Sequence, residues 1–151
     1  MGNTRRFCTF RLDQFLFGID VEHVQEVLRQ QEMTRVPLAP REVKGLINLR
    51  GQIFTALDLR TRLAMAPREG ERPAMNVILR ADGGGVALLV DEIEDVVGVD
   101  EDFFEAPPNQ LSGEARQLVN GVFKLDGRLL LVLDAHRAAE VSKIGRAEQG
   151  A

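Results

Sequence analysis

The sequence predicts a mostly-β fold built from two related halves, each of which is a small barrel of short strands. Three observations carry this prediction. Apolar residues alternate with polar ones over short segments, Gly, Pro and Asp clusters separate those segments, and one strand–turn–strand pattern occurs twice. A chain of 151 residues with 44% hydrophobic residues is long enough to bury a sizeable core without disulfides.

The repeated pattern aligns residues 45–58 with residues 121–134 at a constant offset of 76 and without a gap. Five of the fourteen aligned pairs are identical, which favours true duplication over two unrelated hairpins. These pairs are Gly45/Gly121, Leu49/Leu125, Gly51/Gly127, Leu57/Leu133 and Asp58/Asp134. Each copy has the pattern of a strand, a glycine turn, a second strand, an aspartate cap and a short helix. A weaker similarity relates residues 18–21 to residues 89–92.

The elements follow in chain order. Residues 7–20 predict a hairpin with a tight turn at Asp13-Gln14, and Asp20 is placed to cap a helical turn over 21–23. The β-branched stretch 24–29 is expected to be extended. Later strands are expected at 45–50, 52–57, 76–81, 86–90, 119–125 and 129–133, with helices at 59–63 and from Asp134 to about Val141. The polar tail 142–151 is expected to fray.

Composition excludes several classes of protein. A net charge of −4 and the absence of Trp and Tyr argue against a nucleic-acid-binding barrel, because phosphate contacts need clustered Lys and Arg. No apolar run approaches the roughly 20 residues of a membrane helix, and no secretory signal core follows Met1. A single cysteine cannot form an internal disulfide, so Cys8 is interpreted as a small buried hydrophobe. We expect a cytoplasmic protein.

Residues for catalysis are scarce. The two histidines, His23 and His136, fall in no nucleophile–base pattern and are interpreted as surface residues. Carboxylates between 91 and 102 are interleaved with Ile and Val, which favours a solvated strand over a metal loop. A small hydrolase using Asp91 and Asp95 is the catalytic alternative. No metal or cofactor is expected.

A set of motifs then carries a resemblance to a known family. The motifs are Phe17-Gly18-Ile19-Asp20, Val24-Gln25-Glu26-Val27, Asn48-Leu49-Arg50-Gly51, Leu57-Asp58-Leu59-Arg60, Leu89-Val90-Asp91 and Gly121-Val122-Phe123-Lys124-Leu125. Over about residues 6–140 the chain resembles the CheW family, the coupling proteins of bacterial chemotaxis. The resemblance implies two intertwined five-stranded SH3-like β-barrels with short helices and a C-terminal helix. The expected subdomains are 15–82 and, for the other, 6–14 plus 83–140.

The resemblance also implies a function. Proteins of this family are non-catalytic adaptors that bind the regulatory domain of the histidine kinase CheA and the cytoplasmic tip of chemoreceptors. We therefore expect a scaffold of membrane-associated receptor arrays, monomeric alone, without nucleic-acid binding or membrane insertion. A scaffold of a different chemosensory pathway, such as one for surface motility, is the alternative within the family.

Site residues follow from the matched positions. The kinase-binding residues implied by the resemblance are Val24, Glu26, Val27 and Arg50, with Arg50 pairing with Glu26. The receptor-binding groove between the barrels is expected at Ile47, Leu49, Leu88 and Val90. The structural turn residues of the motifs are Asn48, Gly51, Gly121 and Gly127. The chain departs from family members that carry an aromatic residue after Ala-Pro, because Pro108-Asn109-Gln110 follows Ala106-Pro107.

Overall fold

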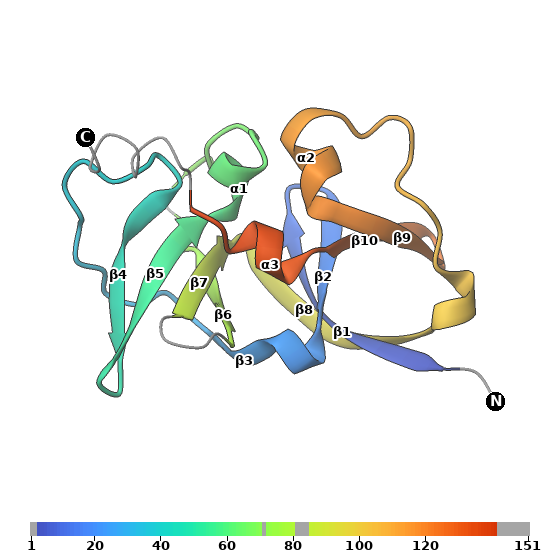
Figure 1. Cartoon of the computed structure of the whole chain (residues 1–151), viewed down its shortest axis with the longest axis horizontal. Helices are drawn as coiled ribbons and strands as arrows, with labels where there is room; N and C mark the ends of the chain where they lie inside the picture. The colour runs from blue at the N-terminus through green and yellow to red at the C-terminus, as the bar shows by residue number, and fades with distance from the viewer. Residues whose placement is uncertain (1–2, 71, 81–84, 142–151) are drawn as a thin grey trace.

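A computed structural model describes residues 3–70, 72–80 and 85–141. It contains two five-stranded sheets, which lie side by side along the long axis of the molecule (Figure 1). Sheet A has the strand order β8-β1-β2-β10-β9 and sheet B the order β3-β6-β7-β5-β4. The expected mostly-β fold with two five-stranded units is confirmed, while the expected tail 142–151 lies outside the described residues.

The strands of each sheet come from distinct parts of the chain. Those of sheet A are β1 (Thr4–Leu12), β2 (Phe15–Asp20), β8 (Glu92–Asp100), β9 (Val119–Leu125) and β10 (Arg128–Leu133). Those of sheet B are β3 (Val24–Leu28), β4 (Val43–Leu49), β5 (Gln52–Asp58), β6 (Met75–Leu79) and β7 (Gly85–Val90). The 3-10 turn η1 (Val21–His23) leads from sheet A to sheet B, and Asp91 leads back.

These crossings correct the expected subdomain boundaries. Half A consists of residues 4–20 and 92–138, and half B of residues 24–90, instead of a division at 15 and 82. The tight turn at Asp13-Gln14 makes β1 and β2 an antiparallel pair, so both strands stay in one sheet. Strand β7 likewise pairs with β6 and remains in half B.

The predicted duplication is visible in the arrangement of the strands. Strand β10 runs parallel to β2 in half A, as β5 runs parallel to β7 in half B. A shift of 76 residues carries β4 onto β9 and helix α1 (Leu59–Arg62) onto helix α3 (Ala135–Ala138). The weaker similarity between residues 18–21 and 89–92 does not match the duplication in the structure. Gly18 pairs with Val132, which is equivalent to Ala56 at the offset of 76. Because Ala56 pairs with Ala87, Gly18 is equivalent to Ala87 and not to Leu89.

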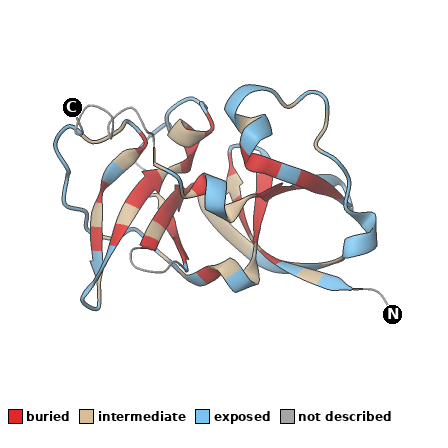
Figure 2. Ribbon diagram, in the orientation of Figure 1, coloured by how far each residue is buried: buried red, intermediate tan, exposed pale blue. Residues whose placement is uncertain are grey.

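The core consists of three apolar clusters, one of which joins the two halves. The largest is shared, since Phe10, Phe17 and Leu131 of half A pack with residues of half B such as Leu57 and Leu88. Smaller clusters fill each half, one around Phe54 and Ile78, the other around Phe7 and Phe123. Buried residues accordingly lie mainly on the strands, while most residues of the loops are exposed (Figure 2). Burial of this apolar area is the main stabilising contribution, and it makes the halves one folding unit.

Aspartate caps begin both repeated helices, as predicted. Asp58 Oδ1 accepts a hydrogen bond from the Arg60 N–H at 3.1 Å, and Asp134 Oδ1 accepts one from the Arg137 N–H at 3.1 Å. Helix α3 ends at Ala138, three residues before the expected end. Asp20 precedes η1 but makes no capping bond, because its carboxylate accepts a hydrogen bond from Arg5 at 2.8 Å.

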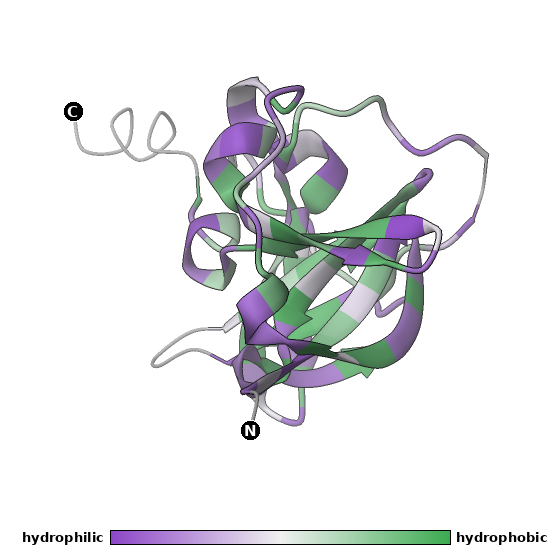
Figure 3. Cartoon of the chain, turned by 90° about the vertical axis from the view of Figure 1, so that its right-hand side faces the viewer, coloured by the Kyte–Doolittle hydropathy of each residue, from purple (hydrophilic) through white to green (hydrophobic). Residues whose placement is uncertain are grey.

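Two further short helices, η2 (Glu101–Phe103) and α2 (Gly113–Leu118), were not predicted. Seen from the end of half A, hydrophilic and hydrophobic residues alternate along the outer strands, as solvated strands require (Figure 3). None of the described helices is long and apolar enough to span a bilayer. Cys8 is half-buried, and burial raises the pKa of its thiol.

Candidate functional site

The predicted pair of Arg50 and Glu26 is present at the outer end of half B. Arg50 Nη2 forms an ion pair with Glu26 Oε2, and the arginine side chain is 71% exposed. Arg50 occupies the first central position of the β4–β5 turn, where its φ is +52°, and Gly51 follows at +84°. Two positive φ angles in a two-residue hairpin define a type I′ turn. The Gly51 N–H donates to Asn48 Oδ1 at 3.0 Å, which explains the asparagine of the motif.

The expected exposed contact at Val24 is wrong, since only 7% of Val24 is exposed and the residue belongs to the shared core. The register of β3 against β6 shifts between Val24 and Glu26, so simple alternation along the strand did not show which side chain faces solvent. Val27, in contrast, is 41% exposed beside Glu26. Strand β3 is an edge strand of sheet B, and the exposed Val27 side chain is available to a partner there.

The residues expected to line a receptor groove lie in the protein core instead. Ile47, Leu88 and Val90 are at most 1% exposed, and Leu49 packs at the edge of the cluster inside half B. Leu88 and Val90 belong to the shared core, whereas Ile47 and Leu49 belong to the core of half B. Strands that are apolar on both faces are covered on both sides in the folded protein. The sequence alone therefore does not distinguish a groove residue at the end of such a strand from a core residue.

The structure places a cleft between the halves elsewhere. It has a volume of about 450 Å³ and lies between η1, the ends of β6 and β7, and helix α3. Its lining residues are His23, Leu79, Arg80, Val86, Ala135, His136, Ala139 and Glu140. The rings of His23 and His136 meet edge to face, 5.9 Å between centroids. The sequence predicts that both are surface residues, and nothing in the spacing of His23 and His136 indicates that they converge.

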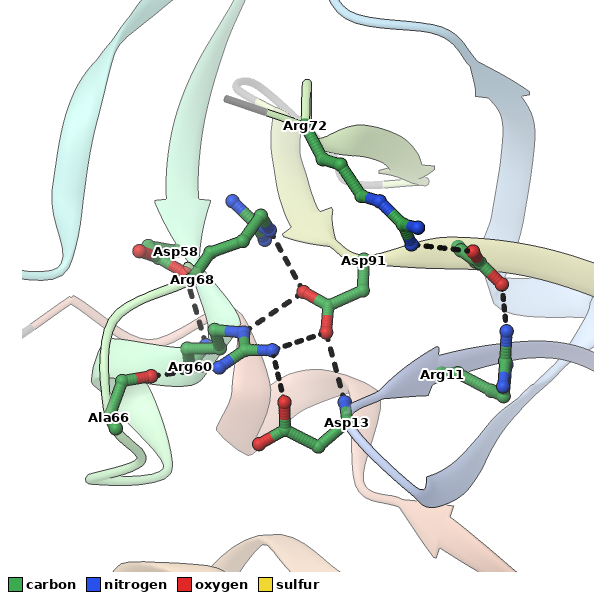
Figure 4. A network of polar contacts seen from close by, with 9 residues as sticks. Arg11, Asp13, Asp58, Arg60, Ala66, Arg68, Arg72 and Asp91 are labelled. Carbon is green, nitrogen blue, oxygen red and sulfur yellow. Dashed lines mark hydrogen bonds and ion pairs between the residues drawn. The ribbon is translucent and has the colours of Figure 1, made fainter. Parts of the chain in front are cut away.

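At another place along the junction, a buried arginine joins the halves (Figure 4). Only 6% of the Arg60 side chain is exposed. Its Nε donates to Asp91 Oδ1 at 2.9 Å, and its Nη2 donates both to Asp91 Oδ2 and, at 2.6 Å, to Asp13 Oδ1. The Arg60 Nη1 donates to the Ala66 carbonyl at 2.9 Å. Four donors of a planar guanidinium are therefore fixed by residues of both halves.

Asp91 is the acceptor at the centre of this network. Besides Arg60, it receives hydrogen bonds from Arg68 Nε and from the Asp13 N–H, both at 2.9 Å. Burial alone would raise the pKa of Asp91, but hydrogen bonds from Arg60, Asp13 and Arg68 outweigh it and lower the pKa to about 2. Hydrogen bonding to Asp91 in turn raises the pKa of Arg60.

This environment counts against the hydrolase alternative. A general base needs an accessible carboxylate with a pKa near the working pH, whereas Asp91 is occupied and strongly acidic. Two of the neighbouring carboxylates of β8 are paired as well: Glu92 with Arg11, and Glu94 with Arg11 and Arg128. Across the described ranges, no group of three or more His, Cys, Asp or Glu side chains is arranged to hold a metal ion.

The turn glycines of the two repeats are explained by backbone geometry. Gly127 has a φ of +78°, close to that of Gly51, and both are in the region that glycine adopts without strain. A Cβ on Gly121 would lie 2.5 Å from the Glu105 carbonyl oxygen and 2.3 Å from the Phe104 ring. Phe103, which is 70% exposed, lies three residues before Ala106-Pro107, the segment after which this chain lacks the aromatic residue of other family members.

Fold and site together define a scaffold-type β protein: two fused five-stranded units whose charged groups serve contacts between parts of the chain. Residues 6–142 match the family model described as CheW-like domain. The chain belongs to the CheW family, the chemotaxis coupling scaffolds.

Individual relatives agree with this assignment. The chain is 31% identical over 133 residues to the chemotaxis protein CheW of Treponema pallidum (strain Nichols), covering 85% of this chain and 78% of the relative. It is 31% identical over 120 residues to that of Bacillus subtilis (strain 168), covering 80% and 77%. Among solved structures, the scaffolding protein TtCheW from Thermoanaerobacter tengcongensis superposes with a TM-score of 0.82 at 28% identity, covering 94% of this chain and 92% of that one.

Proposed function

We propose that this scaffold couples the cytoplasmic tips of chemoreceptors to the regulatory domain of the histidine kinase CheA, without catalysing a reaction itself. The observation that carries the proposal is the Arg50–Glu26 ion pair beside the exposed Val27 on an edge strand. The protein would work in the cytoplasm, recruited to membrane-associated receptor arrays.

The kinase domain would dock on β3. Val27 offers an exposed apolar anchor on this edge strand. The exposed Arg50–Glu26 pair by itself adds only about 0–1 kcal/mol to folding stability. Its role is instead to orient the edge, since the guanidinium reaches from the β4–β5 turn to β3.

The receptor tip would occupy the cleft between the halves. Leu79, Val86, Ala135 and Ala139 give this cleft an apolar lining, and His23, His136, Arg80 and Glu140 supply polar groups. A concave apolar site with a few polar groups at the contact of two units is where ligand segments commonly bind. It takes the place of the groove that the sequence had located at Ile47 and Leu88.

The test is a pull-down with the kinase regulatory domain and a receptor-tip fragment as separate baits. Wild type is expected to bind both, and Val27→Asp to lose at least about tenfold in affinity for the kinase domain only, as for a hot-spot side chain. Val96→Asp is the matched control, because Val96 is 49% exposed on β8, an edge strand of sheet A.

Retention of neither bait by wild type would overturn the proposal. If Val27→Asp and Val96→Asp lose kinase binding equally, β3 is not the docking strand for the kinase domain. Kinase domains from each chemosensory system of the same genome, used in parallel, would separate the chemotaxis role from a motility pathway.

A further inference from the structure

We propose that helix α1 is a clasp that sets the angle between the two halves and thereby the width of the cleft in which a receptor segment would dock. The α1 clasp consists of Arg60 and Arg62 with their partners Asp13, Asp91 and Glu114. This inference rests on the proposed function for its binding arm, whereas the geometry of the clasp can be tested without any partner.

The two arginines of α1 reach half A in different places. Arg60 binds Asp13 in the β1–β2 turn and Asp91 where the chain returns to half A. Arg62 Nη1 donates to Glu114 Oε2 of α2 at 3.1 Å, and its Nη2 donates to the Arg137 carbonyl of α3 at 3.1 Å. Residues i and i+2 of a helix point about 200° apart, so one helical turn can contact two separate parts of the other half.

Directional bonds make these contacts suited to fixing an angle. Apolar packing in the shared core tolerates small rotations, because it is non-directional. A bidentate guanidinium–carboxylate pair with a third acceptor, as at Arg60, specifies both position and plane. A buried ion pair adds little net stability compared with apolar packing. The main contribution of the Arg60 contacts is therefore to fix the geometry between the two halves.

The Arg60 contacts of the clasp and the η1 side of the cleft lie at opposite ends of strand β7, while helix α3 both contacts Arg62 and lines the cleft. Val86 lines the cleft near the start of β7, and Asp91 follows directly after its end at Val90. Five residue steps along an extended strand separate Val86 from Asp91 by about 16 Å. In Figure 1, α1 accordingly lies at the top of the junction and η1 at the bottom. A rotation of one half about the clasp end would therefore open or narrow the cleft.

The experiment uses the double variant Asp13→Asn with Glu114→Gln, which weakens both sides of the clasp. The two replaced side chains are 46% and 47% exposed, so no buried charge is left alone inside α1. Spin labels at Ile53→Cys and Leu129→Cys, in a Cys8→Ala background, report the distance between the halves. These two positions are equivalent in the repeat and are 49% and 42% exposed.

We expect the distance distribution to broaden in the double variant while the melting temperature stays within a few degrees. Affinity for a receptor-tip fragment should fall about fivefold or more, the lower range of coupling between sites, with kinase-domain binding unchanged. Reversal of the second pair, Arg62→Glu with Glu114→Arg, should keep the distribution narrow because that contact is restored with opposite polarity.

An unchanged distance distribution would overturn the clasp. A broadened distribution with unchanged receptor-tip affinity would overturn its link to docking, as would an equal loss of kinase and receptor binding. If wild type does not bind the receptor tip at all, the proposed function fails, and the distance measurement still decides whether α1 sets the angle.

Discussion

The two repeated units, residues 43–62 and 119–138, share a backbone and differ in chemistry. Both contain two strands, a two-residue turn ending in glycine, an aspartate cap and one helical turn. At the first central turn position, half B has Arg50 and half A has Asp126. On the helix, half B has Arg60 and half A has His136. The duplicated fold therefore kept the residues that the backbone requires, and the contact residues diverged.

The turns show how sequence differences act on the backbone. Arg50 is left-handed and its turn is closed by Asn48, whereas in the second turn only Gly127 has a positive φ. Lys124 stands in the place of Asn48 and supplies no acceptor for the turn N–H. A non-glycine residue at positive φ is uncommon, so the backbone of Arg50 is strained. Asn at this position would adopt the same conformation more easily.

The helices differ in how they meet the junction. Arg60 is buried and bound by two carboxylates, so charged groups join the two halves at one end of the junction. Its equivalent His136 is exposed and touches His23 beside a cleft. The two equivalent helix positions therefore make different contacts at the same interface, a buried ion-pair network at Arg60 and an exposed ring contact at His136.

The largest expected effect comes from removing the buried arginine. Arg60→Met should lower the free energy of unfolding by about 3 kcal/mol, since Asp91 and Asp13 lose charged hydrogen bonds and Asp91 keeps only Arg68 and the Asp13 N–H. His136→Ala, at the equivalent exposed position, should change it by less than about 0.5 kcal/mol. Urea unfolding of both variants measures the difference, and similar values would show that the two helices contribute alike.

The second expected effect is a loss of stability in acid. The pKa of Asp91 lies below its ordinary value of 3.8, at about 2, so the unfolded state binds the proton more tightly. Its contribution is complete above about pH 4 and is lost as the pH falls toward 2. Asp91→Asn should flatten the stability profile in this window, as measured by thermal unfolding between pH 2 and 5. An unchanged slope would contradict the strong pairing of Asp91.

The smallest expected effect separates turn geometry from docking. Arg50→Asn should stabilise the type I′ turn by about 0.5 kcal/mol, because Asn-Gly is the favoured pair there, and should weaken kinase-domain binding. Asp126→Asn should leave both stability and binding nearly unchanged, since residue 126 is not left-handed. Calorimetric melting and titration with the kinase domain measure the two quantities, and stabilisation by both variants would remove the distinction.

Most elements of the fold could be predicted from local sequence patterns. The offset of 76 located both hairpins and both caps, because turn glycines and capping aspartates act within a few residues. The pairing of Arg50 with Glu26 followed from the family motif. Burial at Val24 and Leu88 did not follow, since an apolar residue in a strand can face either the core or a partner.

The sequence by itself determined the mostly-β class, the duplication and the family, since short-range periodicity and turn chemistry record these directly. Only the tertiary structure decided that β2 belongs to half A, that Arg60 joins the two halves, and that His23 and His136 meet at a cleft. Each of these depends on contacts between residues far apart in the chain, such as Arg60 with Asp13 and Asp91. No local periodicity encodes such contacts, because they form only when the shared core brings the two halves together.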